Sequence, residues 1–169
     1  TLDNLVGVNS LTVEGWVYAS DWGENNTGII ADKSANDTVG WTVHISNTVG
    51  FRAIAHFDVQ DAISESGLDD WGTAQLNGWH HIAAVYSGGN TRWYLWIDGV
   101  EVSYSLAQVG NNNPVADAAA TGYLANNAAA GRGWDGMLGW IRISSGSVYT
   151  TGTDFTPPPR CPLPGLASG

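Results

Sequence analysis

The chain has 169 residues, with sixteen acidic and six basic side chains and a formal net charge of −10. This length suits one domain that can bury a sizeable core, and 43% hydrophobic and 13% charged residues are typical of a globular protein. The negative charge repels phosphate backbones and anionic lipids, and no apolar run is long enough to span a bilayer. Composition therefore argues against nucleic acid as a partner and against membrane insertion.

Short runs of β-branched and aromatic residues alternate with clusters of Gly, Asn, Asp and Ser along the chain, and no stretch keeps a helical apolar period. Many short strands with regular turn signals predict an all-β, two-sheet antiparallel sandwich or jelly roll. The expected strands are Leu11–Tyr18, Gly28–Asp32, Gly40–Ser46, Phe51–Asp58, Trp79–Tyr86, Arg92–Ile97, Val100–Ser105 and Met137–Ser144.

Two turn signals define a meander in the middle of the chain. The "SGGN" stretch at Ser87–Asn90 should reverse the chain, and Asp98-Gly99 suits the positive φ angles of a two-residue hairpin turn. We therefore expect three consecutive antiparallel strands between Trp79 and Ser105.

The last residues, "TPPPRCPLPGLASG", read as a tail or linker over 156–169, because proline fixes an extended backbone. Cys161 lies in this tail and is the only cysteine, so no intrachain disulfide can form. An incidental free thiol and an interchain bridge are both open for it.

Five segments, in order and spacing, resemble the laminin-G-like jelly-roll domains of the concanavalin A-like lectin/glucanase superfamily. They are "SLTVEGWVYAS", "GIIADKS", "GWTVHIS", "GWHHIAAVYSGGNTRWYLWIDGVEV" and "GWDGMLGWIRIS". The resemblance implies one β-sandwich over residues 1–155, of a type found in phage virion and bacterial surface proteins. It thereby implies an extracellular, cell-surface or virion-surface location. Such domains usually bind sugar or protein, often with structural Ca²⁺, and a minority of the superfamily hydrolyse glycans.

The chain departs from the family pattern at two places. Family members usually carry another strand upstream of the segment that matches Ser10–Ser20, where this chain has only nine residues. We expect that strand to be missing, replaced or supplied by another chain. The last strand has Gly139-Trp140 where the family often has an acidic pair. A metal or catalytic carboxylate is therefore not carried over to that strand.

Catalysis by two carboxylates is not predicted. Glycoside hydrolases need two carboxylates facing one groove, and the superfamily's hydrolases place them at alternate positions of one strand. The four glutamates are Glu14, Glu24, Glu65 and Glu101, and none lies in such a run. We expect a protein that is not an enzyme.

A polar patch is predicted on an outer sheet face. Because side chains alternate along a strand, Thr42, His44 and Ser46 should oppose the apolar side chains of their strand. By the same alternation, Arg52, His56 and Asp58 should oppose Phe51, Ala53, Ala55 and Phe57. If the two strands are neighbours, His44, Arg52, His56 and Asp58 form a candidate ligand-binding patch. A merely solvated face is the alternative.

The tryptophans divide between core and surface. The family has aliphatic side chains at the positions of Trp93, Leu95 and Ile97, so Trp93 is expected to face the core between the sheets. Trp16, Trp41 and Trp79 are expected in the core too. Tyr94 and Trp96 point the other way, where flat rings can stack on sugars or pair with rings across the strands. Tryptophans in loops are the stronger ligand candidates, although they could instead anchor a subunit interface. The candidate ligand-binding tryptophans are Trp22, Trp71, Trp96 and Trp134.

Side-chain oxygens in the loops are suitable ligands for a Ca²⁺ ion. Asp69 and Asp70 in "SGLDDWG" are the candidate metal ligands, and Asp21 with Glu24 or Asn111–Asn113 offer similar groups. No other cofactor is predicted.

Together these features predict a non-catalytic extracellular or virion recognition module that binds carbohydrate. One alternative is a structural decoration or assembly domain covered by neighbouring protein subunits, such as a homo-oligomer or part of a larger assembly. A glycoside hydrolase is the third hypothesis.

Overall fold

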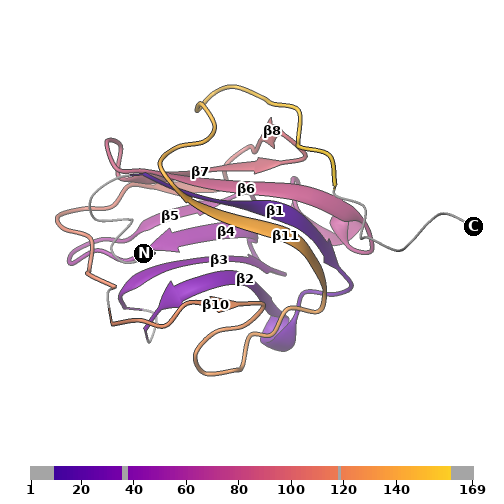
Figure 1. The fold of residues 1–169 in the computed structure, drawn as a ribbon, viewed down its shortest axis with the longest axis horizontal. Helices are drawn as coiled ribbons and strands as arrows, with labels where there is room; N and C mark the ends of the chain where they lie inside the picture. Colours follow the sequence, from indigo (N-terminus) through magenta and orange to yellow (C-terminus); the bar gives the residue numbers. More distant parts are fainter. Residues whose placement is uncertain (1–9, 36–37, 118, 161–169) are drawn as a thin grey trace, which may run out of the picture.

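The computed structural model describes residues 10–35, 38–117 and 119–160, and these form two packed antiparallel sheets (Figure 1). The five-stranded sheet has the order β11-β1-β6-β7-β8, and the six-stranded sheet has the order β10-β2-β3-β4-β5-β9. The five-stranded sheet contains β1 (Leu11–Ala19), β6 (Trp79–Ser87), β7 (Arg92–Ile97), β8 (Val100–Glu101) and β11 (Gly136–Ser145). The six-stranded sheet contains β2 (Thr27–Ser34), β3 (Gly40–Ser46), β4 (Gly50–Ala55), β5 (Ala62–Glu65), β9 (Leu106–Gln108) and β10 (Tyr123–Leu124). The predicted all-β jelly-roll sandwich is confirmed.

All eight predicted strands are present, although two are shorter than expected. β4 ends at Ala55 and β8 at Glu101. The meander β6-β7-β8 is confirmed, and Asp98 and Gly99 have φ angles of 51° and 83°, as its two-residue turn requires. The strands β5, β9 and β10 were not predicted, because they are too short to show an apolar alternation.

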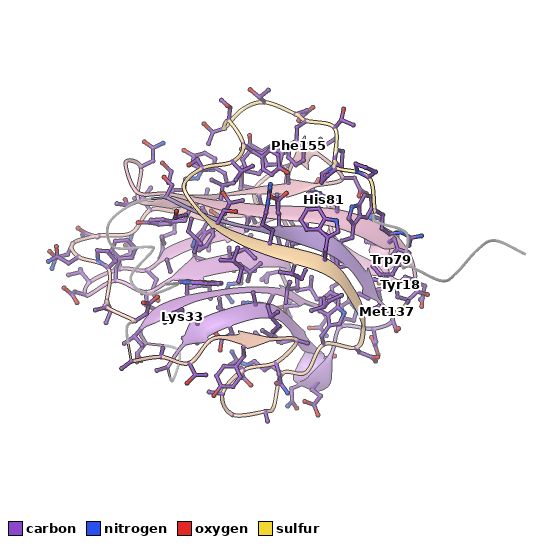
Figure 2. The ribbon with its side chains drawn as sticks, viewed as in Figure 1. Tyr18, Lys33, Trp79, His81, Met137 and Phe155 are labelled. Atoms are coloured by element: carbon purple, nitrogen blue, oxygen red, sulfur yellow. The ribbon has the colours of Figure 1, made fainter. Side chains whose placement is uncertain are left out.

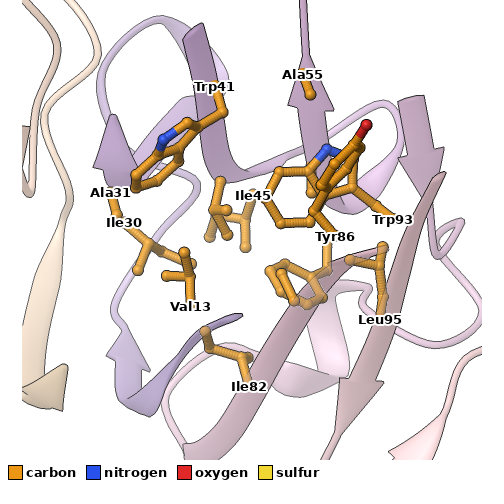
Figure 3. Close-up of a cluster of buried hydrophobic side chains, with 14 of the residues drawn as sticks. Val13, Ile30, Ala31, Trp41, Ile45, Ala55, Ile82, Tyr86, Trp93 and Leu95 are labelled. Carbon is orange, nitrogen blue, oxygen red and sulfur yellow. The ribbon is translucent and has the colours of Figure 1, made fainter. Parts of the chain in front are cut away.

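The core lies between the sheets, and the predicted alternation fills it. Trp41, Val43 and Ile45 of β3 belong to one buried cluster with Trp93 and Leu95 of β7. Figure 3 shows Trp41, Ile45, Trp93 and Leu95 in this cluster. Trp93 also packs edge-on against Tyr86, with ring centroids 5.5 Å apart. The prediction that Trp41 and Trp93 serve the core is confirmed.

The outer face of the five-stranded sheet is covered by residues 147–160, called here the C-terminal segment, whose first part is the yellow trace that arches over β7 and β8 in Figure 1. Phe155 of this segment lies near His81 of β6 (Figure 2), with ring centroids 5.8 Å apart. Residues 156–160, predicted as the start of a tail, lie along the same sheet, where the Trp16 indole donates to the carbonyl oxygen of Pro158.

Trp16 and Trp79 are not part of the core, so that prediction is wrong. The core side chains of β1 include Val13 and Val17, and alternation therefore turns Trp16 outward. Trp79 lies next to Tyr18 on the same outer face (Figure 2), and the guanidinium of Arg160 lies 4.7 Å from its ring centroid. The C-terminal segment gives both indoles a packing partner outside the core.

A buried polar cluster lies under the C-terminal segment. Glu14 of β1 is fully buried, and it accepts hydrogen bonds from Arg142 Nε at 2.6 Å and from the Tyr149 hydroxyl. His81 Nε2 lies 3.5 Å from the same carboxylate. This cluster ties β1, β6 and β11 to the covering segment.

Residues 1–9 and Cys161 lie outside the described residues, so the expectations about an upstream strand and about the thiol remain predictions. Within the ranges given above, no helix has the length and apolar character needed to cross a bilayer.

Candidate functional site

A cavity of about 220 Å³ opens on the outer face of the six-stranded sheet. Its lining combines hydroxyl, imidazole and guanidinium groups with one aliphatic side chain: Thr27, Thr42, His44, Ser46, Arg52, Ile54, His56 and Arg132. We call this cavity the sheet pocket. Three of the four residues of the predicted polar patch therefore come together here, namely His44, Arg52 and His56.

Strand alternation explains how β3 and β4 build the pocket floor. The side chains of Thr42, His44 and Ser46 point away from the core because Trp41, Val43 and Ile45 fill it. In the antiparallel register His44 pairs with Arg52, and Thr42 pairs with Ile54. The polar side chains of one strand therefore lie directly beside those of the next.

Arg132 comes from a loop far along the chain and forms a wall of the pocket. The ladder between β2 and β3 is irregular between Ile29 and Ala31, and the Ile29 amide instead donates to the Arg132 carbonyl at 3.1 Å. The Arg132 amide donates to Asn126 Oδ1 at 3.3 Å, and Glu24 Oε2 accepts from the Gly133 amide at 3.1 Å. These backbone contacts fix the position of the arginine beside the sheet.

The pocket lining contains two arginines and no carboxylate, although the protein as a whole is acidic. Burial, together with the positive charges of Arg52 and Arg132, lowers the pKa of His44 from 6.5 to about 3. His44 is thus neutral at pH 7, with one ring nitrogen a donor and the other an acceptor. Arg52 Nε lies 3.1 Å from Glu65 Oε1 across the β4–β5 ladder, which orients the guanidinium along the sheet.

Arg52 Nε is buried without a hydrogen bond, although it faces Glu65. Three further buried polar atoms of the pocket make no hydrogen bond within the described protein: Thr42 Oγ1, His44 Nδ1 and His56 Nε2. Their residues are only 3%, 4% and 5% exposed, respectively. A buried polar group without a partner costs about 1–3 kcal/mol, so such groups normally have one. Three of them around one cavity give its floor the capacity to hydrogen-bond to a polar ligand or to water.

His56 is held by Asp61, and Asp58 is not part of the pocket. His56 Nδ1 lies 3.0 Å from Asp61 Oδ2, and the other oxygen of Asp61 accepts from the Phe57 amide at 2.9 Å. A carboxylate oxygen accepts, so Nδ1 of His56 donates to Asp61, and Nε2 is the ring nitrogen without a partner in the described protein. β4 ends at Ala55, so alternation no longer applies at Asp58, which lies exposed in a bend.

Trp71 and Trp96 are both fully buried, so neither can stack on a ligand in this structure. The Trp71 ring packs against Phe51, with centroids 6.3 Å apart, because its loop turns into the sandwich. Trp96 points outward as predicted, but the C-terminal segment covers it. Its indole donates to the Thr153 carbonyl at 3.1 Å, and its ring contacts Phe155. Tertiary packing buries both rings, which corrects the prediction that Trp71 and Trp96 contact a ligand.

Trp22 and Trp134 are half-buried, and both pack against the core instead of lining the sheet pocket. A Cβ added to Gly28 would lie 3.1 Å from the Trp134 ring, so this ring rests on the backbone of β2. The structure therefore does not bring the loop tryptophans together with the patch around His44.

The candidate metal ligands do not form a coordinating group. Asp70 Oδ2 accepts from the Ser103 amide at 2.8 Å, and Asp69 is exposed. Across the described ranges, no group of three or more His, Cys, Asp or Glu side chains could hold a metal ion. Asp69 and Asp70 therefore do not fit a calcium site by themselves.

Sequence reasoning missed Arg132, Thr27 and Ile54 as pocket residues. Thr42 and Ser46 were placed on the correct face by alternation but were not chosen as candidates. The only sequence signal for Arg132 is its place as a cation in the glycine-rich stretch "AAAGRGWDG".

Comparison with known proteins supports the fold. No curated protein matches the chain by sequence. Among solved structures, a proposed carbohydrate-binding protein of Bacteroides ovatus is 14% identical, with a TM-score of 0.57 over 83% of this chain and 38% of its own. The SAP-like pentraxin of Limulus polyphemus is 14% identical, with a TM-score of 0.59 over 85% of this chain and 67% of its own.

The CBM40 of the Ruminococcus gnavus IT-sialidase, bound to α2,3-sialyllactose, is 11% identical. Its TM-score is 0.61 over 86% of this chain and 81% of its own. At these identities the likeness shows a shared fold. The family model Laminin_G_3, described as "Concanavalin A-like lectin/glucanases superfamily", matches residues 1–150. With most of its length covered by this match, the chain belongs to the concanavalin A-like lectin/glucanases superfamily.

Proposed function

We propose that this domain is a non-catalytic recognition module that binds a glycan in the sheet pocket. The observation that carries the proposal is the group of three buried, unpartnered polar atoms on Thr42, His44 and His56. Each of them can make a hydrogen bond to a ligand that enters the pocket.

Sugar hydroxyls suit this set of groups because each can both donate and accept. The arginines are donors, the Thr42 hydroxyl can be either, and the neutral His44 ring offers one donor and one acceptor nitrogen. The volume of about 220 Å³ is below the roughly 300–1,000 Å³ of pockets for drug-sized ligands, so it fits one sugar ring. Two of the structural neighbours are a proposed carbohydrate-binding protein and a module bound to sialyllactose, which supports the same ligand class.

The absence of catalysis is part of the proposal. Glycoside hydrolysis uses two carboxylates about 5–9.5 Å apart, and the pocket lining contains none. The four glutamates each have a structural partner: Arg142 for Glu14, the Gly133 amide for Glu24, Arg52 for Glu65 and the Tyr104 hydroxyl for Glu101. A glycan bound by the protein should therefore be recovered uncleaved, as mass spectrometry can check.

We place this module on the outside of a cell or virion, following the resemblance in the sequence. The alternative of an assembly domain relied on exposed tryptophans and on an incomplete N-terminal edge. Trp71 and Trp96 are instead covered by the chain itself, and the N-terminal residues lie outside the described part of the chain. Glycan recognition is therefore the stronger proposal of the two.

A glycan array followed by calorimetric titration tests the proposal. Thr42→Val removes a hydroxyl that has no partner in the protein, so the variant should be as stable as the wild type. It should nevertheless bind about tenfold more weakly if that hydroxyl contacts the glycan. Thr73→Val, at an exposed position of the η2 turn (Thr73–Gln75), is the matched control and should bind normally.

Each array is run with Ca²⁺ and with a chelator, which tests whether glycan binding depends on calcium. No binding to any glycan under either condition would refute the proposed function. Equal affinity of Thr42→Val and the wild type would place the glycan outside the sheet pocket.

A further inference from the structure

We propose that the glycan recognised by the sheet pocket is acidic, and that Arg52 and Arg132 hold its carboxylate or sulfate oxygens. This inference rests on the proposed function and adds the chemical class of the sugar.

The distribution of charge is the first support. The chain has sixteen acidic residues and only six Lys and Arg, yet the pocket lining contains two arginines and no carboxylate. If charged side chains were spread evenly over the protein, the pocket would contain more carboxylates than arginines. The local sign is therefore opposite to that of the whole protein, as expected for a site that attracts an anion.

Arg52 and Arg132 come from different parts of the chain, and both place a positive charge near His44. Arg52 comes from β4 and pairs with His44 in the strand register, whereas Arg132 comes from the loop that packs on β2. Burial is the main cause of the low pKa of His44, and both positive charges add to it by disfavouring protonation. Both charges therefore reach the pocket floor, where an anionic group would be stabilised by the same field.

The surrounding contacts leave Arg52 able to bind. Glu65 faces its Nε atom at 3.1 Å, and a guanidinium has four further N–H donors in its planar fork. Glu65 offsets part of the charge of Arg52, and Arg132 adds a second charge while keeping contacts of its own within the protein. His44 is neutral, so one of its ring nitrogens can accept from a sugar hydroxyl beside the acid group.

Acidic and neutral sugars that differ only in the acid group provide the test. Calorimetric titration compares glucuronic acid with glucose, galacturonic acid with galactose, sialyllactose with lactose, and a sulfated with an unsulfated galactose. We expect at least one acidic sugar to bind tenfold or more tightly than its neutral partner, the factor of one hydrogen bond to a charged group. Raising the salt concentration should weaken binding of the acidic sugar only.

Arg132→Gln and Arg52→Gln should each lose this preference for the acidic sugar. Arg160→Gln is the matched control, because Arg160 packs on Trp79 on the other sheet. Arg52→Lys keeps the charge beside Glu65 and shows whether a loss in Arg52→Gln comes from the ligand or from a disturbed sheet. Circular dichroism of every variant shows whether it is folded, and the comparison of sugars on the wild type needs no variant.

Equal binding of acidic and neutral sugars would overturn the inference and leave the proposed function standing. Binding of sulfate or acetate ions as tight as that of the acidic sugar would also overturn it, since the site would then recognise a free anion. Binding of no sugar at all would refute the proposed function, and the inference with it.

Discussion

The buried imidazole of His44 makes the stability of the domain depend on pH well above the range in which carboxylates titrate. Its pKa in the folded protein is about 3, compared with 6.5 for a solvated histidine. The unfolded chain therefore binds a proton at His44 below pH 6.5, whereas the folded protein does not until about pH 3. Stability is fully present above pH 6.5 and is lost as the pH falls through that window.

The size of the effect follows from the shift. Each pH unit inside the window costs up to about 1.4 kcal/mol, so lowering the pH from 7 to 5 should remove about 2 kcal/mol of unfolding free energy through His44. Urea unfolding followed by tryptophan fluorescence at both pH values measures this loss.

His44→Gln should lose about 2 kcal/mol less than the wild type between pH 7 and 5. The other three histidines are present in both proteins, so the difference isolates His44. An equal loss in His44→Gln and the wild type would refute the reasoning. So would an NMR signal of the His44 ring that titrates near pH 6.5.

Three further predictions concern stability and are checked by chemical unfolding. Glu14→Gln should cost about 1–3 kcal/mol, because it removes the buried carboxylate that accepts from Arg142 and Tyr149, and an unchanged stability would contradict the role of this cluster. Gly99→Ala should destabilise strongly, since Gly99 has a φ of 83° and an added Cβ would lie 1.9 Å from the Phe155 carbonyl oxygen. Gly89→Ala meets nothing within 4 Å, so the two glycine variants should differ clearly. Trp96→Ala should cost about 3–5 kcal/mol by opening a cavity under the C-terminal segment, whereas an exposed ring would cost little.

The strands and the pocket floor could be predicted because both follow from alternation within single strands. Trp41, Val43 and Ile45 are apolar, so His44 must point to the opposite face, and the next strand places Arg52 beside it. The turn at Asp98-Gly99 could be predicted for a similar reason, because its positive φ angles depend on these two residues alone.

The rest of the site depends on contacts between distant parts of the chain. Arg132 reaches the pocket because its carbonyl accepts from the Ile29 amide, a contact that no local pattern contains. Trp96 faces outward as alternation predicts, but only the folded C-terminal segment buries it. The prediction equated a side chain that points away from the core with an exposed one. Whether such a side chain is exposed depends on tertiary contacts, here those of the C-terminal segment.

The account is tested most directly by locating a bound glycan. Backbone amide shifts are recorded by NMR while the strongest glycan from the array is titrated into the protein. We predict that the largest shifts occur around Thr42, His44 and His56, on the outer face of the six-stranded sheet. Shifts centred instead on the loops of Trp22 and Trp134, or on the five-stranded sheet, would contradict the assignment of the sheet pocket as the binding site.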